Sequence, residues 1–254
     1  MTDTPIAIGT TLLPVEPPSS LSVAANAEPS KPADLPPITT GTSERYIHGL
    51  ARAVSRASAT DPLTVLFQGE KLPPGQSTAD LDLPALQHMV YEASLARLND
   101  KLTAGGFVVE AGNFAAVACW VPVMVGETHA QASTLAQRPF FRKFLQRDQE
   151  LMREHLYPLA ERVSGGRFWK LSLMARDPEV EYVPGAVRAV LVPFIEQFTS
   201  DQNEGGPMPV WLEAGSEQAR AVYAHFGFRD VGEIDVGGVM TWCMMYTGDI
   251  DVGH

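Results

Sequence analysis

Residues 208–234 read MPVWLEAGSEQARAVYAHFGFRDVGEI, and their pattern indicates three successive elements. Residues 210–213 read VWLE, a short apolar run ending in Glu213 that is typical of a buried strand. Residues 217–225 have the apolar spacing of a short helix, and Gly227-Phe228 leads into a further strand from residue 229. The stretch therefore predicts a strand, a helix and a strand in succession.

Upstream of this unit, the chain predicts helices first. A helix over 43–57 and another over 83–102 each carry an apolar stripe, and Gly105-Gly106 ends the second. Between the two helices Asp61-Pro62 breaks the pattern, and residues 65–69 are expected in a strand or loop.

A β-hairpin and an alternating tail complete the pattern. Residues 107–111 and 114–121 flank Gly112-Asn113, which is typical of a hairpin turn. The remaining segments are one or two helices over 136–163, a strand over 168–174, a helix over 186–199 that contains Pro193, and final strands over 229–235 and 238–246. This order predicts an α/β (α+β) domain that has a mixed sheet with helices on both faces.

The N-terminal segment differs in composition from the rest of the chain. Eight of the 20 prolines lie in residues 1–37, and the first aromatic residue is Tyr46. Such a segment buries too little apolar area to offset its ordering entropy. We therefore predict a mobile or extended arm over 1–42, a globular domain over 43–247 and a tail over 248–254.

Composition and charge exclude several classes of protein. The 254 residues are 45% hydrophobic, and 30 acidic against 19 basic side chains give a net charge of −11. This charge argues against a nucleic-acid or anionic-membrane partner. The chain has no apolar run of about 18 residues, and its N-terminus has no basic region before an apolar core, so we expect a cytoplasmic protein. Two cysteines are too few for a disulfide scaffold or a four-thiolate zinc site, and we expect no metal.

The signatures of the common catalytic classes are missing from the sequence, which has no GxxxxGK[ST], GxGxxG, GxSxG or HExxH motif. Other motifs carry a resemblance. Leu212-Glu213-Ala214 precedes Ala219-Arg220-x-x-Tyr223 and then Gly227-Phe228. Three further motifs lie upstream of it: LVPF at 191–194, FWKLSLMARDPE at 168–179 and AVACWVP at 116–122. This ordered set resembles the GNAT superfamily of N-acetyltransferases, in its small-molecule branch common in fungi.

The resemblance covers about residues 43–247 and implies a fold and a cofactor. It implies a mostly antiparallel central sheet with a splayed strand pair, and we expect the opening between the strands near 116–121 and 169–175. It also implies that acetyl-CoA binds there. Backbone groups of the splayed strand, at Leu173, Met174 and Ala175, would pair with the pantetheine arm. The loop and helix start at Gly185, Ala186, Val187 and Arg188 would hold the pyrophosphate, since a helix N-terminus favours an anion.

The pyrophosphate loop departs from the family pattern of Gln/Arg-x-x-Gly-x-Gly/Ala. Here residues 177–188 read DPEVEYVPGAVR, in which Gly185 is the single glycine and Val187 takes the place of the later small residue. Pro184 removes a backbone donor, and Glu179 and Glu181 add negative charge where phosphates would lie. Arg188 is the compensating cation, so the loop is a degenerate form of the motif.

The catalytic and substrate-binding candidates each have a structural alternative. The resemblance implies that Tyr223 protonates the leaving thiolate, but Tyr223 could also simply pack its helix onto the sheet. Glu213 could be the general base or could cap the following helix. Trp120, Trp169 and Glu110 are candidate substrate-binding residues, although the tryptophans could be core and Glu110 solvated.

Three hypotheses about function follow. The first is an acyltransferase that moves an acetyl group from acetyl-CoA to an amine of a small metabolite, with a homodimer suggested by fold analogy. The second is a GNAT fold that has lost CoA and uses the cleft for other chemistry on an apolar secondary metabolite. The third is a non-enzymatic ligand-binding module. In the second, Pro184, Val187 or the N-terminal arm would fill the pyrophosphate site.

Overall fold

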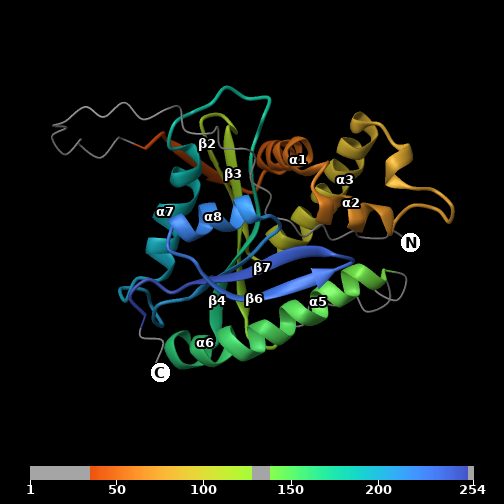
Figure 1. Ribbon diagram of the computed structural model, residues 1–254. Helices are drawn as coiled ribbons and strands as arrows, with labels where there is room; N and C mark the ends of the chain where they lie inside the picture. The colour runs from red at the N-terminus through yellow and green to blue at the C-terminus, as the bar shows by residue number, and fades with distance from the viewer. Residues whose placement is uncertain (1–34, 128–137, 251–254) are drawn as a thin grey trace, which may run out of the picture.

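A computed structural model describes residues 35–127 and 138–250 of the chain (Figure 1). Its centre is a seven-stranded sheet in the order β1-β2-β3-β4-β5-β7-β6. All neighbouring strands are antiparallel except β4 and β5, which run parallel. The strands are β1 (Ile38–Gly41), β2 (Phe107–Ala111), β3 (Ala116–Met124), β4 (Arg167–Arg176), β5 (Val210–Ala214), β6 (Arg229–Val236) and β7 (Val239–Tyr246). The mixed, mostly antiparallel sheet is therefore confirmed.

Helices cover both faces of this sheet. One face is packed by α7 (Ala186–Phe198) and α8 (Glu217–His225), which share a core with inward residues of β2 to β5. The other face is packed by helices in two groups that Figure 1 shows above and below β7. These are α1 (Glu44–Ser58), α2 (Pro62–Gly69), a short 3₁₀ turn (Thr78–Asp80) and α3 (Leu83–Thr103), and then α5 (Pro139–Leu151), a π-helical turn (Met152–Leu156) and α6 (Tyr157–Ser164).

Local sequence signals explain most of these boundaries. Ser216 begins α8, because its hydroxyl accepts a hydrogen bond from Ala219 N–H at 3.1 Å. The predicted helix over 217–225 is thus confirmed, and Glu213 does not cap it. Gly165, at φ 66°, ends α6 in the left-handed conformation that glycine adopts most readily.

Two expectations about local structure were wrong. Residues 65–69 lie in a helix, α2, because the Asp61 carboxylate caps it by accepting from Leu63 and Thr64 N–H. The β2–β3 turn spans residues 112–115, not Gly112-Asn113 alone, because Ala111 pairs with Ala116. Within the predicted mobile or extended arm over 1–42, residues 38–41 form the extended strand β1 and pair with β2. The rest of the predicted arm, up to residue 34, lies outside the described residues.

Candidate functional site at the β4–β5 gap

The parallel strands β4 and β5 separate after a short contact. They pair only at Trp169 with Val210 and at Lys170 with Trp211. Beyond this point β4 continues to Arg176 with its β5-facing edge unpaired by any described strand. The opening was expected between β3 and β4, but those two strands pair along the whole of β3. The splay therefore lies on the other edge of β4.

A β-bulge in β4 sets which side chains face the gap. Cys119 pairs with Leu173 and Trp120 with Leu171, so Ser172 is an extra residue in β4. The bulge puts Leu171 and Met174, three residues apart, into the same core on the α7 face. Leu173 and Ala175 instead pack under α1 and α3. The predicted pantetheine-binding residues 173–175 thus lie on the unpaired length of β4.

The N-terminus of α7 lies at the open end of the gap. Gly185 precedes it at φ 78°, a left-handed conformation that suits glycine. Ala186 N–H donates to Val183 O at 3.1 Å, whereas the N–H groups of Val187 and Arg188 belong to a first turn that has no intrahelical acceptors. A cavity of about 170 Å³ lies here, which we call the loop cavity. Its lining is Ala115, Arg176, Tyr182, Val183, Gly185, Ala186, Val187, Arg188 and Phe226.

Two guanidinium groups line the loop cavity, and the sequence interpretation identified only one of them. Arg188 was expected, while Arg176, the last residue of β4, was not. The Arg176 guanidinium lies 5.4 Å from the centroid of the exposed Tyr182 ring, on which it stacks. Two cations and first-turn N–H groups around a cavity of this size fit a pyrophosphate. The available signal was a basic residue at the exact end of the splayed strand.

The acidic residues of the β4–α7 loop are partly neutralised by α1. Arg56 contacts Asp177 Oδ2 at 2.9 Å and Glu179 Oε2 at 3.0 Å. Glu179 is therefore drawn toward α1, which reduces the repulsion expected from it. Gly185 has close neighbours as well: a Cβ built on it would lie 3.4 Å from Pro36 Cδ and 3.6 Å from Leu35 Cδ2. The start of the described chain thus covers part of the predicted phosphate loop.

Tyr223 lies inside the gap and is completely buried. Its hydroxyl approaches the Met174 sulfur at 3.7 Å, and its ring packs on Phe228 at a centroid distance of 5.7 Å. Burial, followed by the nearby Glu213 charge, raises the pKa of Tyr223 well above its ordinary value. The phenol is thus a neutral proton donor across the physiological pH range. The Met174 sulfur is a weak hydrogen-bond acceptor, so substrate atoms could compete for the Tyr223 hydroxyl proton.

A buried charge cluster lies on the opposite side of the gap. Lys170 Nζ bridges Glu213 Oε1 at 2.5 Å and Asp148 Oδ2 at 3.2 Å. The indole N–H of Trp211 points between the same carboxylates, 3.0 Å from each. The two carboxylates are each about 2% exposed. We call Asp148, Lys170 and Glu213 the carboxylate–lysine cluster.

Burial and the charges of the cluster shift the pKa values of Glu213 and Lys170. Burial, and then the Asp148 charge, raise the pKa of Glu213 to about 7, against the opposing effect of Lys170. Burial alone would lower the pKa of Lys170, but Asp148 and Glu213 outweigh it and raise that pKa. A carboxylate that titrates near neutral pH suits a general base. Arg97 on α3 also points to this side: it is 3% exposed and donates to Ser172 Oγ at 3.0 Å.

The three substrate-binding candidates do not converge on one cavity. Trp120 is fully buried, and its indole N–H donates to Val190 O at 3.3 Å. Trp169 stacks on Phe198 at 4.1 Å, also under α7. Glu110 lies at the β2–β3 turn, where its carboxylate accepts from Thr39 Oγ1 and from Phe114 N–H. The tryptophans thus support α7, and Glu110 holds the turn.

The fold has known counterparts. A yellow fever mosquito protein assigned as arylalkylamine N-acetyltransferase 7 superposes with a TM-score of 0.50 over 80% of this chain and 84% of that one, at 13% identity. The chain has the GNAT fold. Two further structures superpose less well: an agmatine N-acetyltransferase (TM-score 0.47, 12% identity, 82% of this chain and 98% of that one) and the C-terminal condensation domain of Ebony (0.48, 10%, 84% and 99%). No protein-family model and no curated protein sequence matches the chain.

Two kinds of feature are missing from the described residues. Across 35–127 and 138–250, no three His, Cys, Asp or Glu side chains are grouped as metal ligands. Within the same ranges, no helix is both long enough and apolar enough to cross a membrane.

Proposed function

We propose that this GNAT-fold chain transfers an acetyl group from acetyl-CoA to an amine of a small metabolite. The observation that carries the proposal is the Tyr223 hydroxyl, which lies against the unpaired length of β4 at the position that the family resemblance gives to the proton donor. The loop cavity supports it, because its two guanidinium groups and the α7 N-terminus suit the phosphates of CoA.

On the coenzyme side, the chain's own groups bind and orient. CoA would supply the activated acetyl thioester. Arg176, Arg188 and the first-turn N–H groups of α7 hold phosphate oxygens, and the free edge of β4 offers backbone groups to the amides of the pantetheine arm. Pro184 contributes no donor, so the two side chains carry more of the binding than in a glycine-rich loop.

On the amine side, the chain moves two protons. Glu213, directly or through water, accepts a proton from the substrate ammonium, and Lys170 holds Glu213 Oε1 in place. The neutral amine then attacks the thioester carbonyl, Tyr223 donates its proton to the departing sulfur, and the second proton lost by the amine nitrogen restores the phenol through water. The burial that raises the pKa of this phenol raises the pKa of a thiol in the same site, so donor and acceptor stay matched. The net charge of −11 favours the approach of a cationic amine.

The test is a panel of amines incubated with acetyl-CoA, with free thiol and acetylated product both measured. Tyr223→Phe keeps the buried ring and removes only the hydroxyl, so it should lower kcat about 100-fold while the unfolding midpoint stays near that of the wild type. Equal turnover by wild type and Tyr223→Phe would remove Tyr223 from the chemistry. No acetylated product with any amine would reject the proposed reaction.

A second candidate is favoured by Leu35 and Pro36, which lie against Gly185. In that case the fold acts without CoA on an apolar secondary metabolite, or binds one without chemistry. The same assay separates the candidates, since a chain of this kind would leave acetyl-CoA unconsumed.

A further inference from the structure

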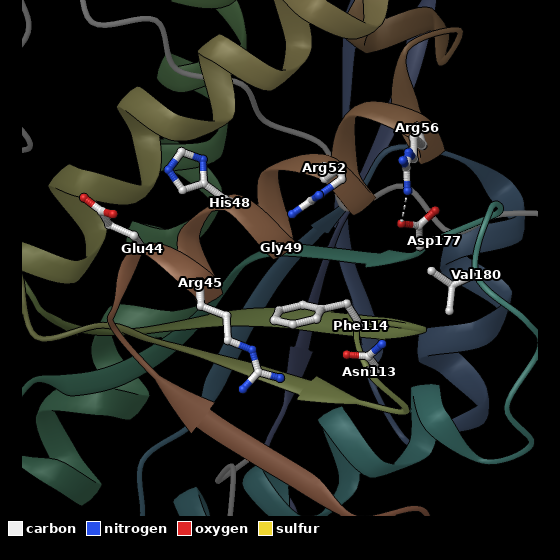
Figure 2. Close-up of a pocket in the computed structure, with 10 residues that line it drawn as sticks. All are labelled: Glu44, Arg45, His48, Gly49, Arg52, Arg56, Asn113, Phe114, Asp177 and Val180. Carbon is white, nitrogen blue, oxygen red and sulfur yellow. Dashed lines mark hydrogen bonds and ion pairs between the residues drawn. The ribbon is translucent and has the colours of Figure 1, made fainter.

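A larger cavity lies on the other side of the β4–α7 loop, next to α1 (Figure 2). Its volume is about 560 Å³, which falls within the range of about 300–1,000 Å³ that small-molecule sites occupy. We call it the α1 pocket. It shares no lining residue with the loop cavity, and its walls come from α1, the β2–β3 turn and the start of the β4–α7 loop. It is therefore a separate site.

The wall of the α1 pocket formed by α1 is mainly basic, with Glu44 as its one acidic residue. Arg45, His48, Arg52 and Arg56 are spaced three or four residues apart, so they lie on one helix face. Arg56 is neutralised by Asp177 and Glu179. Within 35–127 and 138–250, neither Arg45 nor Arg52 has a carboxylate partner. The chain has 30 acidic and 19 basic side chains. Two such arginines at one cavity therefore give a local positive charge in a protein whose net charge is negative.

An aromatic ring forms another wall of the pocket. Phe114 has φ 70°, which is uncommon for a bulky residue. Its backbone N–H donates a hydrogen bond to the Glu110 carboxylate at 2.9 Å. The ring lies directly on Gly49, where any Cβ would overlap it. The Arg45 guanidinium is 5.4 Å from the ring centroid. Figure 2 shows the ring between the two arginines.

We infer that the α1 pocket binds a small organic anion with a planar apolar group, whose phosphate or carboxylate contacts Arg45 and Arg52 and whose planar group lies on Phe114. Guanidinium groups match both anions by paired hydrogen bonds, and an aromatic face contributes apolar contact. Arg45 and Arg52 are two helical turns apart, about 10.5 Å along the axis, and their long side chains can reach one ligand. The inference does not depend on acetyl transfer.

The first experiment is calorimetric titration of the full chain with phenyl phosphate, benzoate and benzyl alcohol. We expect phenyl phosphate to bind with a Kd of about 100 µM, benzoate more weakly, and the neutral alcohol not at all. Arg52→Gln should weaken phenyl phosphate about tenfold, because one charged contact is lost. Arg142→Gln changes an exposed arginine on α5, away from the pocket, and should leave the Kd unchanged.

A second variant tests the aromatic wall. Phe114→Gly suits the positive φ and removes the ring, so phenyl phosphate should then bind no better than inorganic phosphate. Three outcomes would overturn the inference: no phenyl phosphate binding at about 5 mM, equal weakening by Arg142→Gln and Arg52→Gln, or competition between phenyl phosphate and acetyl-CoA. The last would assign the anion to the loop cavity and would leave the proposal of acetyl transfer standing.

Discussion

On the α7 side of the β4–β5 gap, Arg176 and Arg188 border an open cavity of about 170 Å³, whereas on the α5 side Lys170 is shared by two carboxylates that are each about 2% exposed. The first region presents cations to solvent at a helix N-terminus, and the second neutralises its charges internally. Exposed cations can bind a diffusing polyanion, whereas buried charges that are paired with one another suit the holding or transfer of a proton. The two regions therefore suit the two halves of an acetyl transfer.

The largest expected effect concerns the stability of the buried region. Lys170→Met leaves Asp148 and Glu213 without their cation, and should lower the free energy of unfolding by about 3–5 kcal/mol at pH 8. Urea denaturation measures this change. At pH 5 the loss should be smaller, because Glu213, whose pKa is raised to about 7, is then protonated and needs no counter-ion.

The matched control is an exposed ion pair. Arg220→Met breaks the contact between Arg220 and Asp230, both of which are 39% exposed, and should change stability far less. A loss from Arg220→Met as great as that from Lys170→Met would mean that the buried cluster has no special role.

The next effect concerns pH. Because the pKa of Glu213 is raised to about 7, its carboxylate becomes available as a base only above that pH, and kcat/KM should rise through pH 7. Glu213→Gln should lower kcat/KM about 100-fold and abolish its rise through pH 7. If kcat/KM of Glu213→Gln still rises at the same pH, another group is the base.

The smallest expected effect concerns acetyl-CoA affinity and the acidic residues of the β4–α7 loop. Glu179 is paired with Arg56, and Glu181 is exposed near the loop cavity. Glu181→Gln should therefore tighten acetyl-CoA binding about twofold at low salt, and Glu179→Gln less. Fluorescence competition measures both. A larger gain from Glu179→Gln would show that its pairing with Arg56 does not neutralise it.

The sequence predicted local features far better than it predicted the site. The α8 boundaries were right because Ser216 and the apolar spacing act within a few residues. The carboxylate–lysine cluster could not be predicted, since its three residues are far apart along the chain. Lys170 and Glu213 meet through the parallel β4–β5 contact, and Asp148 reaches them from α5. The opening was assigned to the wrong edge of β4, because the alternation of apolar and polar side chains within a strand does not show from which adjacent strand it separates.

The individual site residues follow the same pattern. Tyr223 and Arg188 were identified from a motif, and the structure places them at the gap and the loop cavity. Arg176 was missed because its signal, a basic residue at the end of the splayed strand, is weak by itself. The pairing of Glu179 with Arg56 was also invisible, because it joins segments more than 120 residues apart.

The role of the loop cavity in acetyl-CoA binding is tested most directly by calorimetric titration of the wild type and the Arg176→Glu, Arg188→Glu double variant at low and moderate salt. We expect micromolar binding by the wild type that weakens as salt rises, and a loss of at least about 100-fold in the double variant. Absence of wild-type binding at near-millimolar acetyl-CoA, or equal affinity in the two proteins, would contradict this role.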